Sequence, residues 1–388
     1  MRISRRGQTA PFRAMDVLAA AQRLETAGRD VVHMEVGEPA FGAPAAARRA
    51  LEAAFSAGET LGYTGGLGIP ALRQAIAGLY RRRHGLAIDP ARVVVTAGSS
   101  AAFQLAFLGL FEAGARVGIA DPGYPAYRNI LFALGLEAVR IETHLATRYQ
   151  PVPSDVPAAD GLDGLLVASP ANPTGTMLDR PALEALTAAC ADEGAILICD
   201  EIYHGLTYGD AAVSALEVTD DVIVIGSFSK YYAMTGWRIG WMVVPEGLVR
   251  PLETLAQNLF ICPPHASQVA ALGALSADGE AEVARHLESY RANRRAVVAA
   301  LPALGFRDIA PCDGAFYAYA RLPEGEGDST EFCERLLAEQ GVALTPGLDF
   351  DPVRGDETVR LSFAQAPDRI AEGLRRLEAF MAREPAAV

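Results

Sequence analysis

The sequence lacks the long apolar run that a membrane-spanning helix needs. Arg2, Arg5 and Arg6 could open a secretory signal, but residues 7–12 form no apolar core behind them. Positive charge is also scarce, because 34 Lys and Arg stand against 47 Asp and Glu and give a formal net charge of −13. So acidic a chain is poorly suited to nucleic acid or anionic membranes. We expect a cytoplasmic protein with neither kind of partner.

Cysteine is scarce too. The five cysteines are odd in number, widely spaced, and form no Cys-x-x-Cys pair or metal-ligand spacing: Cys190, Cys199, Cys262, Cys312 and Cys333. Cys199 lies inside the apolar run 195–199, where a small thiol packs like a hydrophobic residue. We therefore expect reduced, mostly buried cysteines and neither a disulfide framework nor a metal site.

Short apolar runs dominate the middle of the chain. Each ends in small, polar or acidic residues, and they lie at 93–96, 116–121, 165–169, 195–200 and 222–226. Runs of this length that are apolar on both faces are typical of central strands in a parallel sheet. Helix-like stretches at 101–111 and 181–191 alternate with them, the second with Asp179 as its expected cap. The pattern predicts an α/β domain with helices on both faces of the sheet.

The alternation of strand-like runs and helix-like stretches changes before about residue 42 and after about residue 275. A chain of 388 residues is also too long for one hydrophobic core, so we expect two domains. Residues 280–301 read as a long charged helix, and 315–320 and 358–363 alternate like half-buried strands. We expect a large domain at 42–275 and a small domain built from 1–41 and 276–388. The Pro-rich stretch 151–159 is predicted to be a surface connection, and the basic run 81–83 a solvated helix end.

Ligands of open α/β sheets bind at the carboxyl ends of the strands, so the residues that follow each run matter most. The run 93–96 leads into Ala97-Gly98-Ser99-Ser100, a turn of small residues that opens a helix. Free N–H groups and the helix dipole there can hold a phosphate. The alternative is a plain connection in which Ser99 caps the helix.

A lysine follows the run 222–226. Lys230 stands behind Ser227 and Ser229, with Arg238 eight residues later. Desolvation and nearby cations lower the charge preference of a lysine, which imine formation requires, and the hydroxyls and the guanidinium suit a phosphate dianion. The alternative is a solvated surface lysine.

Three further strand ends carry suggestive residues. Asp200 could keep a pyridine nitrogen protonated, the alternatives being a helix cap or a metal ligand. Asn172 lies between two prolines, where a cis peptide before Pro173 would suit a tight loop, and it could donate to a phenolic oxygen or simply form a turn. Tyr124 could stack on an aromatic ring or only pack.

Together and in this order, these residues resemble the class I and II aminotransferases, the fold type I pyridoxal-phosphate enzymes. The resemblance runs from Gly37-Glu38-Pro39 through Tyr63 to Arg360-Leu361-Ser362 and so covers nearly the whole chain. It implies a mostly parallel mixed sheet in the large domain, a small α+β domain, and an obligate homodimer with shared sites. It also implies that Lys230 binds pyridoxal 5′-phosphate (PLP) as an internal aldimine and then moves the substrate Cα proton.

The resemblance implies a role for each remaining residue. Asp200 pairs with the pyridinium, Tyr203 and Asn172 bond the phenolic oxygen, and Tyr124 stacks on the ring. Arg360 binds the substrate α-carboxylate, with help from Asn172 and the backbone near Gly37. The residues that match the phosphate site are Ser99, Ser100, Ser227, Ser229 and Arg238, with Tyr63 reaching the phosphate of the partner subunit.

The implied reaction moves an amino group between an L-amino acid and a 2-oxo acid. β-Elimination, as in carbon–sulfur lyases of this fold, is the alternative. A non-enzymatic one is the aminotransferase-like domain of some transcription regulators, but about forty residues before the large domain are too few for a DNA-binding module. Ser100 stands where aspartate-specific bacterial relatives often carry a lysine, and a second arginine for a side-chain carboxylate cannot be located. We therefore expect neutral or aromatic amino donors.

Overall fold

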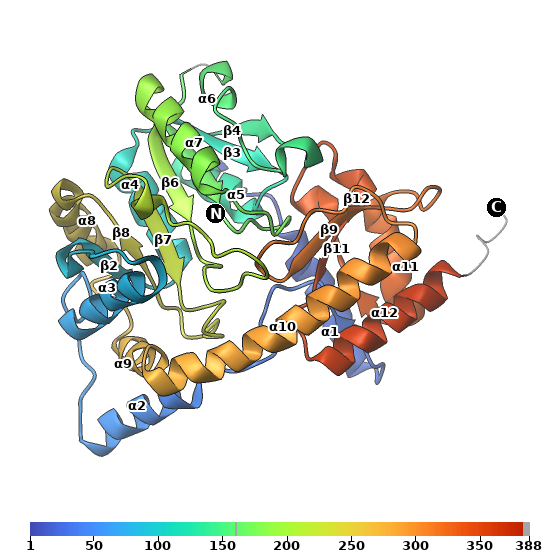
Figure 1. Ribbon diagram of the computed structural model, residues 1–388, viewed down its shortest axis with the longest axis horizontal. Helices are drawn as coiled ribbons and strands as arrows, with labels where there is room; N and C mark the ends of the chain where they lie inside the picture. Colours follow the sequence, from blue (N-terminus) through green and yellow to red (C-terminus); the bar gives the residue numbers. More distant parts are fainter. Residues whose placement is uncertain (160, 383–388) are drawn as a thin grey trace.

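A seven-stranded sheet forms the centre of the larger part of the molecule (Figure 1). The computed structural model describes residues 1–159 and 161–382. β8 runs antiparallel to its neighbours β2 and β7, and the other pairs are parallel, which confirms the expected mixed, mostly parallel sheet. The strands, in order across the sheet, are β2 (Val93–Thr96), β8 (Gly240–Val243), β7 (Ile223–Ser227), β6 (Ile196–Asp200), β5 (Gly164–Ala168), β3 (Arg116–Asp121) and β4 (Glu137–Glu142).

Alternate strand residues enter two separate cores. Val94 of β2 packs with the first core, whereas Val93 and Val95 pack with the second. The first core includes side chains of α4 (Ser99–Leu110), α5 (Pro125–Leu134) and α8 (Glu246–Leu259). The second includes side chains of α3 (Pro70–His84), α7 (Arg180–Glu193) and α9 (His265–Ala274). Helices therefore cover both faces, as the apolar runs predict.

The two ends of the chain meet in the smaller part of the molecule (Figure 1). There α1 (Arg13–Thr26) and α12 (Pro367–Met381) both contact strands from the C-terminal part of the chain. β1 (Val32–His33) pairs in parallel with β10 (Val342–Ala343). A second sheet has the order β11 (Thr345–Pro346), β12 (Thr358–Ser362) and β9 (Tyr317–Arg321). Because β1 joins a strand more than 300 residues away, we propose that 1–41 and 276–388 form one domain and 42–275 the other.

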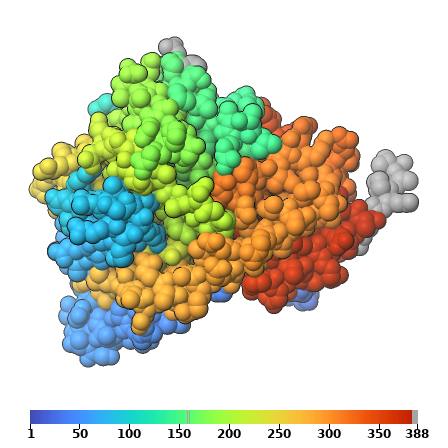
Figure 2. All heavy atoms as spheres, in the orientation of Figure 1, coloured from blue at the N-terminus to red at the C-terminus, as the bar shows by residue number. Residues whose placement is uncertain are grey.

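The remaining helices connect and cover these sheets. Figure 2 shows α10 in orange crossing the face of the molecule between its two parts. These helices are α1 (Arg13–Thr26), α2 (Ala45–Ser56), α6 (Asp155–Ala158), α10 (Ala277–Ala303), α11 (Ser329–Gln340) and α12 (Pro367–Met381). Short 3-10 helices lie at η1 (Arg5–Gly7), η2 (Pro90–Arg92), η3 (Leu145–Thr147), η4 (Ala215–Glu217), η5 (Gly347–Asp349) and η6 (Gly355–Glu357). Within the described residues, no helix combines the length and apolar character that a bilayer crossing needs.

Several local expectations are confirmed. Asp179 caps α7 by accepting from Ala182 N at 2.9 Å, and the Asn172–Pro173 peptide is cis, as are the bonds before Pro122 and Pro170. The cysteines are free thiols, of which Cys262 is half-buried and the other four are buried.

One alternative is excluded and two local expectations are wrong. Ser99 does not cap α4, because Gly98 occupies that position and no side-chain bond caps the helix. The run 81–83 is not wholly solvated, since Arg83 turns inward and donates to His204 O at 3.1 Å and to the Tyr232 hydroxyl at 3.2 Å. The stretch 151–159 is more than a surface connection, because it contains α6 and buries Val156 against the second core.

Candidate active site

A cleft of about 460 Å³ opens beyond the carboxyl ends of the central strands, within the usual size of a ligand site of roughly 300–1,000 Å³. It gathers residues from both of the proposed domains. Ten of the predicted site residues line it: Gly37, Ser99, Ser100, Tyr124, Asn172, Tyr203, Ser229, Lys230, Arg238 and Arg360. Three predicted site residues do not line it. Asp200 is buried behind Tyr127, and Ser227 is buried behind Ser229. Tyr63 projects into solvent, with 84% of its surface exposed.

Lys230 is part-buried, and its ammonium donates to Gly37 O at 2.6 Å. Burial lowers its pKa to about 8, and the positive charges of Arg360 and Arg238 act in the same direction. Only glycine allows this contact, because a Cβ at position 37 would collide with the hydroxyl of Tyr317. Lys230 is also the only lysine of the chain, every other basic residue among the 34 being an arginine. A partly neutral amine in this cleft is a nucleophile.

Asp200 ends β6 and is buried. Its Oδ1 accepts from Ile202 N at 3.0 Å, and its Oδ2 accepts from the hydroxyl of Tyr127. Burial raises the pKa of Asp200 to about 6, while the bonds from Tyr127 and Ile202 oppose the rise. A cationic ring nitrogen beside this carboxylate would favour its ionised form. Sequence reasoning missed Tyr127, although it follows Tyr124 by three residues at the start of a predictable helix, so the two lie on one face.

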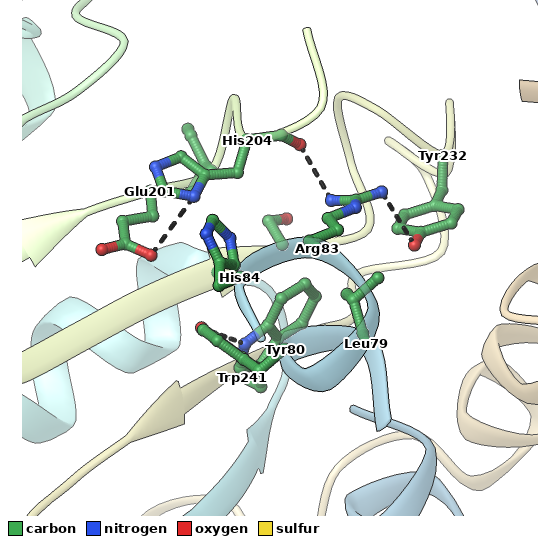
Figure 3. Close-up of a pocket in the computed structure, with 11 residues that line it drawn as sticks. Leu79, Tyr80, Arg83, His84, Glu201, His204, Tyr232 and Trp241 are labelled. Atoms are coloured by element: carbon green, nitrogen blue, oxygen red, sulfur yellow. Dashed lines mark hydrogen bonds and ion pairs between the residues drawn. The ribbon is translucent and has the colours of Figure 1, made fainter. Parts of the chain in front are cut away.

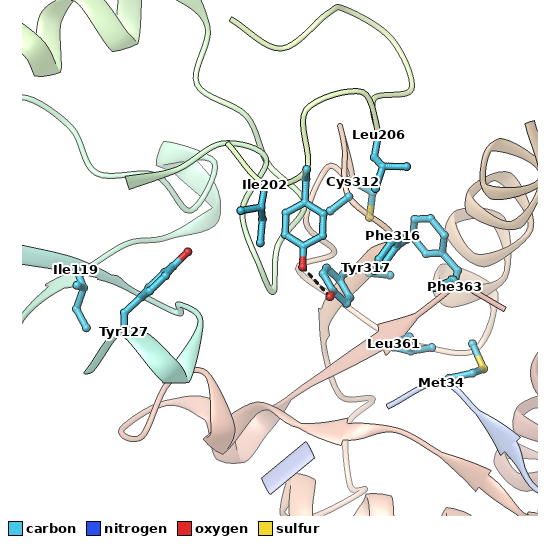
Figure 4. Packing of buried hydrophobic residues seen from close by; sticks show 14 of the residues in the cluster. Met34, Ile119, Tyr127, Ile202, Leu206, Cys312, Phe316, Tyr317, Leu361 and Phe363 are labelled. Atoms are coloured by element: carbon cyan, nitrogen blue, oxygen red, sulfur yellow. Dashed lines mark hydrogen bonds between the residues drawn. The ribbon is translucent and has the colours of Figure 1, made fainter. Parts of the chain in front are cut away.

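Tyr203 is buried and hydrogen-bonded to a second tyrosine. Its hydroxyl lies 2.8 Å from that of Tyr317, which comes from β9 of the small domain (Figure 4). Tyr317 was also missed by sequence reasoning, because alternation along a strand does not say which domain its side chains face. The pair places a hydroxyl from each domain at the edge of the cleft.

A cradle for an anion lies at the N-terminus of α4. Gly98 has φ +82° and turns the chain so that α4 starts at Ser99, and a Cβ at Gly98 would collide with the guanidinium of Arg238. Ser229 is buried beside it and is held by Ser227, whose Oγ lies 3.0 Å from both Ser229 N and Ser229 Oγ. Free helix N–H groups, a hydroxyl and a guanidinium suit a phosphate dianion.

Arg360 lies on the opposite side of the cleft and is 2% exposed. It donates to Asn172 Oδ1 at 2.9 Å and to the carbonyl of Glu35, both neutral acceptors. Within residues 1–159 and 161–382, no carboxylate pairs with Arg360 and its Nε has no partner. A buried cation without a counter-ion is costly, so this guanidinium marks a site for an anion from outside the chain.

A polar layer supports the turn after β6 from behind (Figure 3). Tyr203 lines the cleft, whereas Glu201 and His204 line the layer. Glu201 accepts from Ala215 N at 2.7 Å, and burial raises its pKa to about 8. His204 Nε2 lies 3.0 Å from Ser169 O, which ties this turn to the loop that carries Asn172. The site residues are thus anchored on both sides.

These groups fit PLP. The cradle at α4 suits its phosphate, the amine of Lys230 its aldehyde, and the carboxylate of Asp200 its ring nitrogen. Gly98 shows this most directly, because its missing side chain leaves room for Arg238 at the start of a helix. Arg360 remains as a second anion site for a substrate carboxylate.

Comparisons with known proteins agree with a PLP-binding site. The family model Aminotransferase class I and II matches residues 29–377. The valine–pyruvate aminotransferase of Mycobacterium tuberculosis is 47% identical over 384 residues, 98% of either chain. A crystal structure of an aminotransferase from the same organism has a TM-score of 0.95 at 46% identity, covering 98% of this chain and 99% of that one. The aspartate aminotransferase of Thermus thermophilus, solved with maleate, has a TM-score of 0.90 at 32% identity, covering 98% and 100%.

None of these relatives favours the carbon–sulfur lyase or the regulatory-domain alternative. The chain belongs to the class I and II aminotransferases, PLP-dependent enzymes that move an amino group between an amino acid and a 2-oxo acid.

Proposed function

We propose that this aminotransferase takes L-amino acids with neutral, apolar side chains as donors and pyruvate or a similar 2-oxo acid as acceptor. The observation that carries the proposal is the lining of the cleft. Its wall from α1 is apolar, and in the described residues its only arginines are Arg238 and Arg360. With Arg238 at the phosphate and Arg360 at the α-carboxylate, no arginine of the cleft is left for a side-chain carboxylate. The similarity to a valine–pyruvate aminotransferase supports the same class of donor.

We propose the following roles around the ring. When bound, PLP supplies an electron sink for the electrons of the substrate Cα. Lys230 Nζ anchors the cofactor and then takes and returns the Cα proton, and no other lysine is present to do so. Asp200 holds the proton on the ring nitrogen. Tyr203 and Asn172 donate to the phenolic oxygen, and Tyr124 packs on the ring.

The two anion sites orient what binds. We propose that Arg360 receives the substrate α-carboxylate in its planar fork, with Asn172 Oδ1 keeping the guanidinium in place at 2.9 Å. Gly37 lines the same side of the cleft and holds the amine of Lys230 through its carbonyl. The phosphate is assigned to Ser99, Ser100, Ser229 and Arg238, with Ser227 acting through Ser229.

We also propose a cytoplasmic homodimer in which Tyr63 serves the site of the partner subunit. The Tyr63 ring lies outside its own cleft and is 84% exposed, so it is open to contact with another subunit. The loop that carries it is fixed, because Gly62 O accepts from His265 at 2.8 Å and Thr64 N donates to Cys262 Sγ at 3.4 Å. Leu259 and Ile261, beside this anchor in sequence, are also exposed.

A donor screen tests the proposed substrate class. The PLP-loaded protein is mixed with single L-amino acids, and the change in the cofactor absorbance is followed with pyruvate as acceptor in the second half-reaction. We expect L-valine and other neutral donors to exceed L-aspartate in kcat/KM by more than about tenfold, because an unpaired buried carboxylate costs at least roughly 1–3 kcal/mol. A preference for L-aspartate would refute the proposal.

A further inference from the structure

Helix α1 receives its N-terminal cap from the far end of the chain. Its own N-cap residue is Phe12, which has no side-chain acceptor. The two carboxylate oxygens of Asp349, more than 330 residues further on, instead accept from Arg13 N at 3.0 Å and from Ala14 N at 3.1 Å. Asp349 is 1% exposed. A buried carboxylate at the positive end of a helix fixes the position of that end.

The capped end of α1 is the apolar wall of the cleft. Phe12, Met15 and Leu18 line it at intervals of three residues, which places them on one face of the helix. The Phe12 ring also packs edge-on against Tyr124, with centroids 5.9 Å apart. A shift at the start of α1 would therefore move the side chains that face a bound substrate.

The residues around Asp349 also hold the other parts of the site. The backbone oxygen of Asp349 accepts from Arg128 Nη2 of α5 at 2.6 Å. The next residue, Phe350, lies under the Arg360 guanidinium at 4.6 Å from ring centroid to Cζ, and its carbonyl accepts from Gly123 N at 3.0 Å. One short segment thus locates both the arginine for the α-carboxylate and the wall for the side chain.

We propose that Asp349 is a positioning residue for substrate selection: by capping α1 it sets the distance between Arg360 and the apolar wall, and so the side chains that fit. This inference rests on the proposed function, since it assigns the wall to the donor side chain. An L-alanine side chain is too short to use the wall fully, whereas a branched donor depends on it. The selectivity, defined as kcat/KM for the preferred donor divided by kcat/KM for L-alanine, reports the position of the wall.

The decisive variants change the contact from the helix side and leave Asp349 in place. Arg13→Pro removes the N–H that Asp349 Oδ1 accepts, and proline is favoured at the first position of a helix. Phe12 has φ −94° and ψ 97°, which is extended and so avoids the helical region that a following proline disfavours. Arg13→Ala is the matched control, because it removes the exposed side chain and keeps the N–H. Both PLP-loaded proteins are assayed with L-valine and L-alanine.

We expect Arg13→Pro to lower the selectivity by about tenfold, the size of effect that a lost helix cap produces, mainly through a higher KM for L-valine. Arg13→Ala should keep the wild-type ratio. Asp349→Asn should act like Arg13→Pro, since the two N–H groups use different carboxylate oxygens and the amide nitrogen that replaces one of them cannot accept. If the Asp349→Asn protein does not fold, the Arg13→Pro protein still tests the role of Asp349.

Two outcomes would overturn the inference. In the first, Arg13→Pro keeps the selectivity of the wild type; in the second, Arg13→Ala loses as much selectivity as Arg13→Pro. A merely stabilising role for Asp349 would lower the melting temperature and leave the ratio unchanged. If the proposed function is wrong, the result is different: the wild-type protein prefers L-aspartate to L-valine as donor. The effect of Arg13→Pro on the ratio of that donor to L-alanine would then still test Asp349.

Discussion

Three ionisable groups at the site share an unusual state. Lys230, Asp200 and Arg360 lie largely out of water, and neither Lys230 nor Asp200 keeps its ordinary pKa. Burial shifts both towards the neutral form, which favours a nucleophilic amine and leaves a carboxylate that a nearby cation can ionise. Arg360 donates to Asn172 Oδ1 and to the Glu35 carbonyl, both of them neutral, so its buried charge favours the binding of an anion. In the proposed function, each group is completed by a different part of the cofactor or substrate.

The pH dependence of cofactor uptake follows from the pKa of Lys230. The amine attacks only when neutral, so the rate at which cofactor-free protein takes up PLP should rise about tenfold per pH unit below about 8 and level off above. A solvated lysine would show a rise that continues to about 10.4. Stopped-flow absorbance between pH 6 and 10 measures this.

Lys230→Ala is the control and should take up no PLP covalently. Because the chain has a single lysine, borohydride reduction and peptide mapping leave only the N-terminal amine as a competing site. A label there, and not on Lys230, would remove the anchor from the proposed mechanism.

Tyr127 should matter to catalysis through Asp200. Its hydrogen bond lowers the pKa of a carboxyl group that burial raises, so Tyr127→Phe should raise the pKa of Asp200 and reduce its ionised fraction at neutral pH. We expect kcat to fall about tenfold, the loss growing as pH decreases, whereas Asp200→Ala should cost several orders of magnitude. The pH profile of kcat measures both.

The control for Tyr127→Phe is Tyr319→Phe, which removes a hydroxyl that lies 2.7 Å from Thr358 Oγ1 and outside the cleft. Equal losses in the two variants would mean that the effect is one of general stability.

At the scale of elements, the site is assembled at strand ends and helix starts. β6 ends at Asp200, β7 ends at Ser227 just before Lys230, and α4 begins at Ser99. This arrangement lets rigid elements hold groups that carry most of the chemistry. The exception is α1, whose start is set by a residue from the opposite end of the chain.

The α4 cradle predicts a specific effect of Gly98→Ala. A Cβ at this position would collide with Arg238, and φ +82° is strained for alanine, so the Kd for PLP should rise more than tenfold. Gly114→Ala is a matched control, because Gly114 has φ +88° and no atom within 4 Å of its Cβ position. Fluorescence titration of the cofactor-free proteins compares them. An equal loss in both would trace the effect to backbone strain.

How far the sequence predicts these elements depends on their surroundings. The central strands were predictable because both faces are buried and the runs are mostly apolar. β4 was missed because it is an edge strand in which the charged residues Glu137, Arg140 and Glu142 interrupt the apolar ones. β8 was also missed, although it is buried and has four residues like β2, which was predicted. Lys230 as the only lysine is a signal that the sequence holds and that motif reasoning overlooked.

Contacts between distant segments were beyond prediction. Nothing local in the sequence indicates that Tyr317 of the small domain meets Tyr203, or that Asp349 caps α1, since both depend on how the two domains pack. The order of motifs nevertheless identified the family, because each motif lies at a strand end whose neighbours in the sheet follow from the parallel topology.

For the whole molecule, the cleft lies between the segments that we propose as the two domains, 1–41 with 276–388 and 42–275. Arg360 and Tyr317 come from the small domain, Lys230 and Asn172 from the large one. An ion-pair network at the same junction links Arg140 of β4 to Asp121 and Asp351. With the proposed roles, substrate binding depends on how the proposed domains are held together. Tyr63 is the one proposed cofactor contact that lies outside the cleft of its own chain and projects into solvent.

A test of the shared site uses two inactive parents. Tyr63→Ala should impair PLP binding in the partner's site, and Lys230→Ala should abolish turnover in its own. If Tyr63 serves the partner, a hybrid dimer collects both defects in one site and leaves the other intact, so mixing the parents under subunit exchange should restore up to about half of the wild-type activity per hybrid. Differently tagged subunits and a tandem pull-down isolate the hybrid. The control replaces Tyr63→Ala with Phe55→Ala, a change at another exposed aromatic residue. If Tyr63 acts within its own subunit, the hybrid has one defect in each site, and activity stays at the average of the parents even though hybrids form.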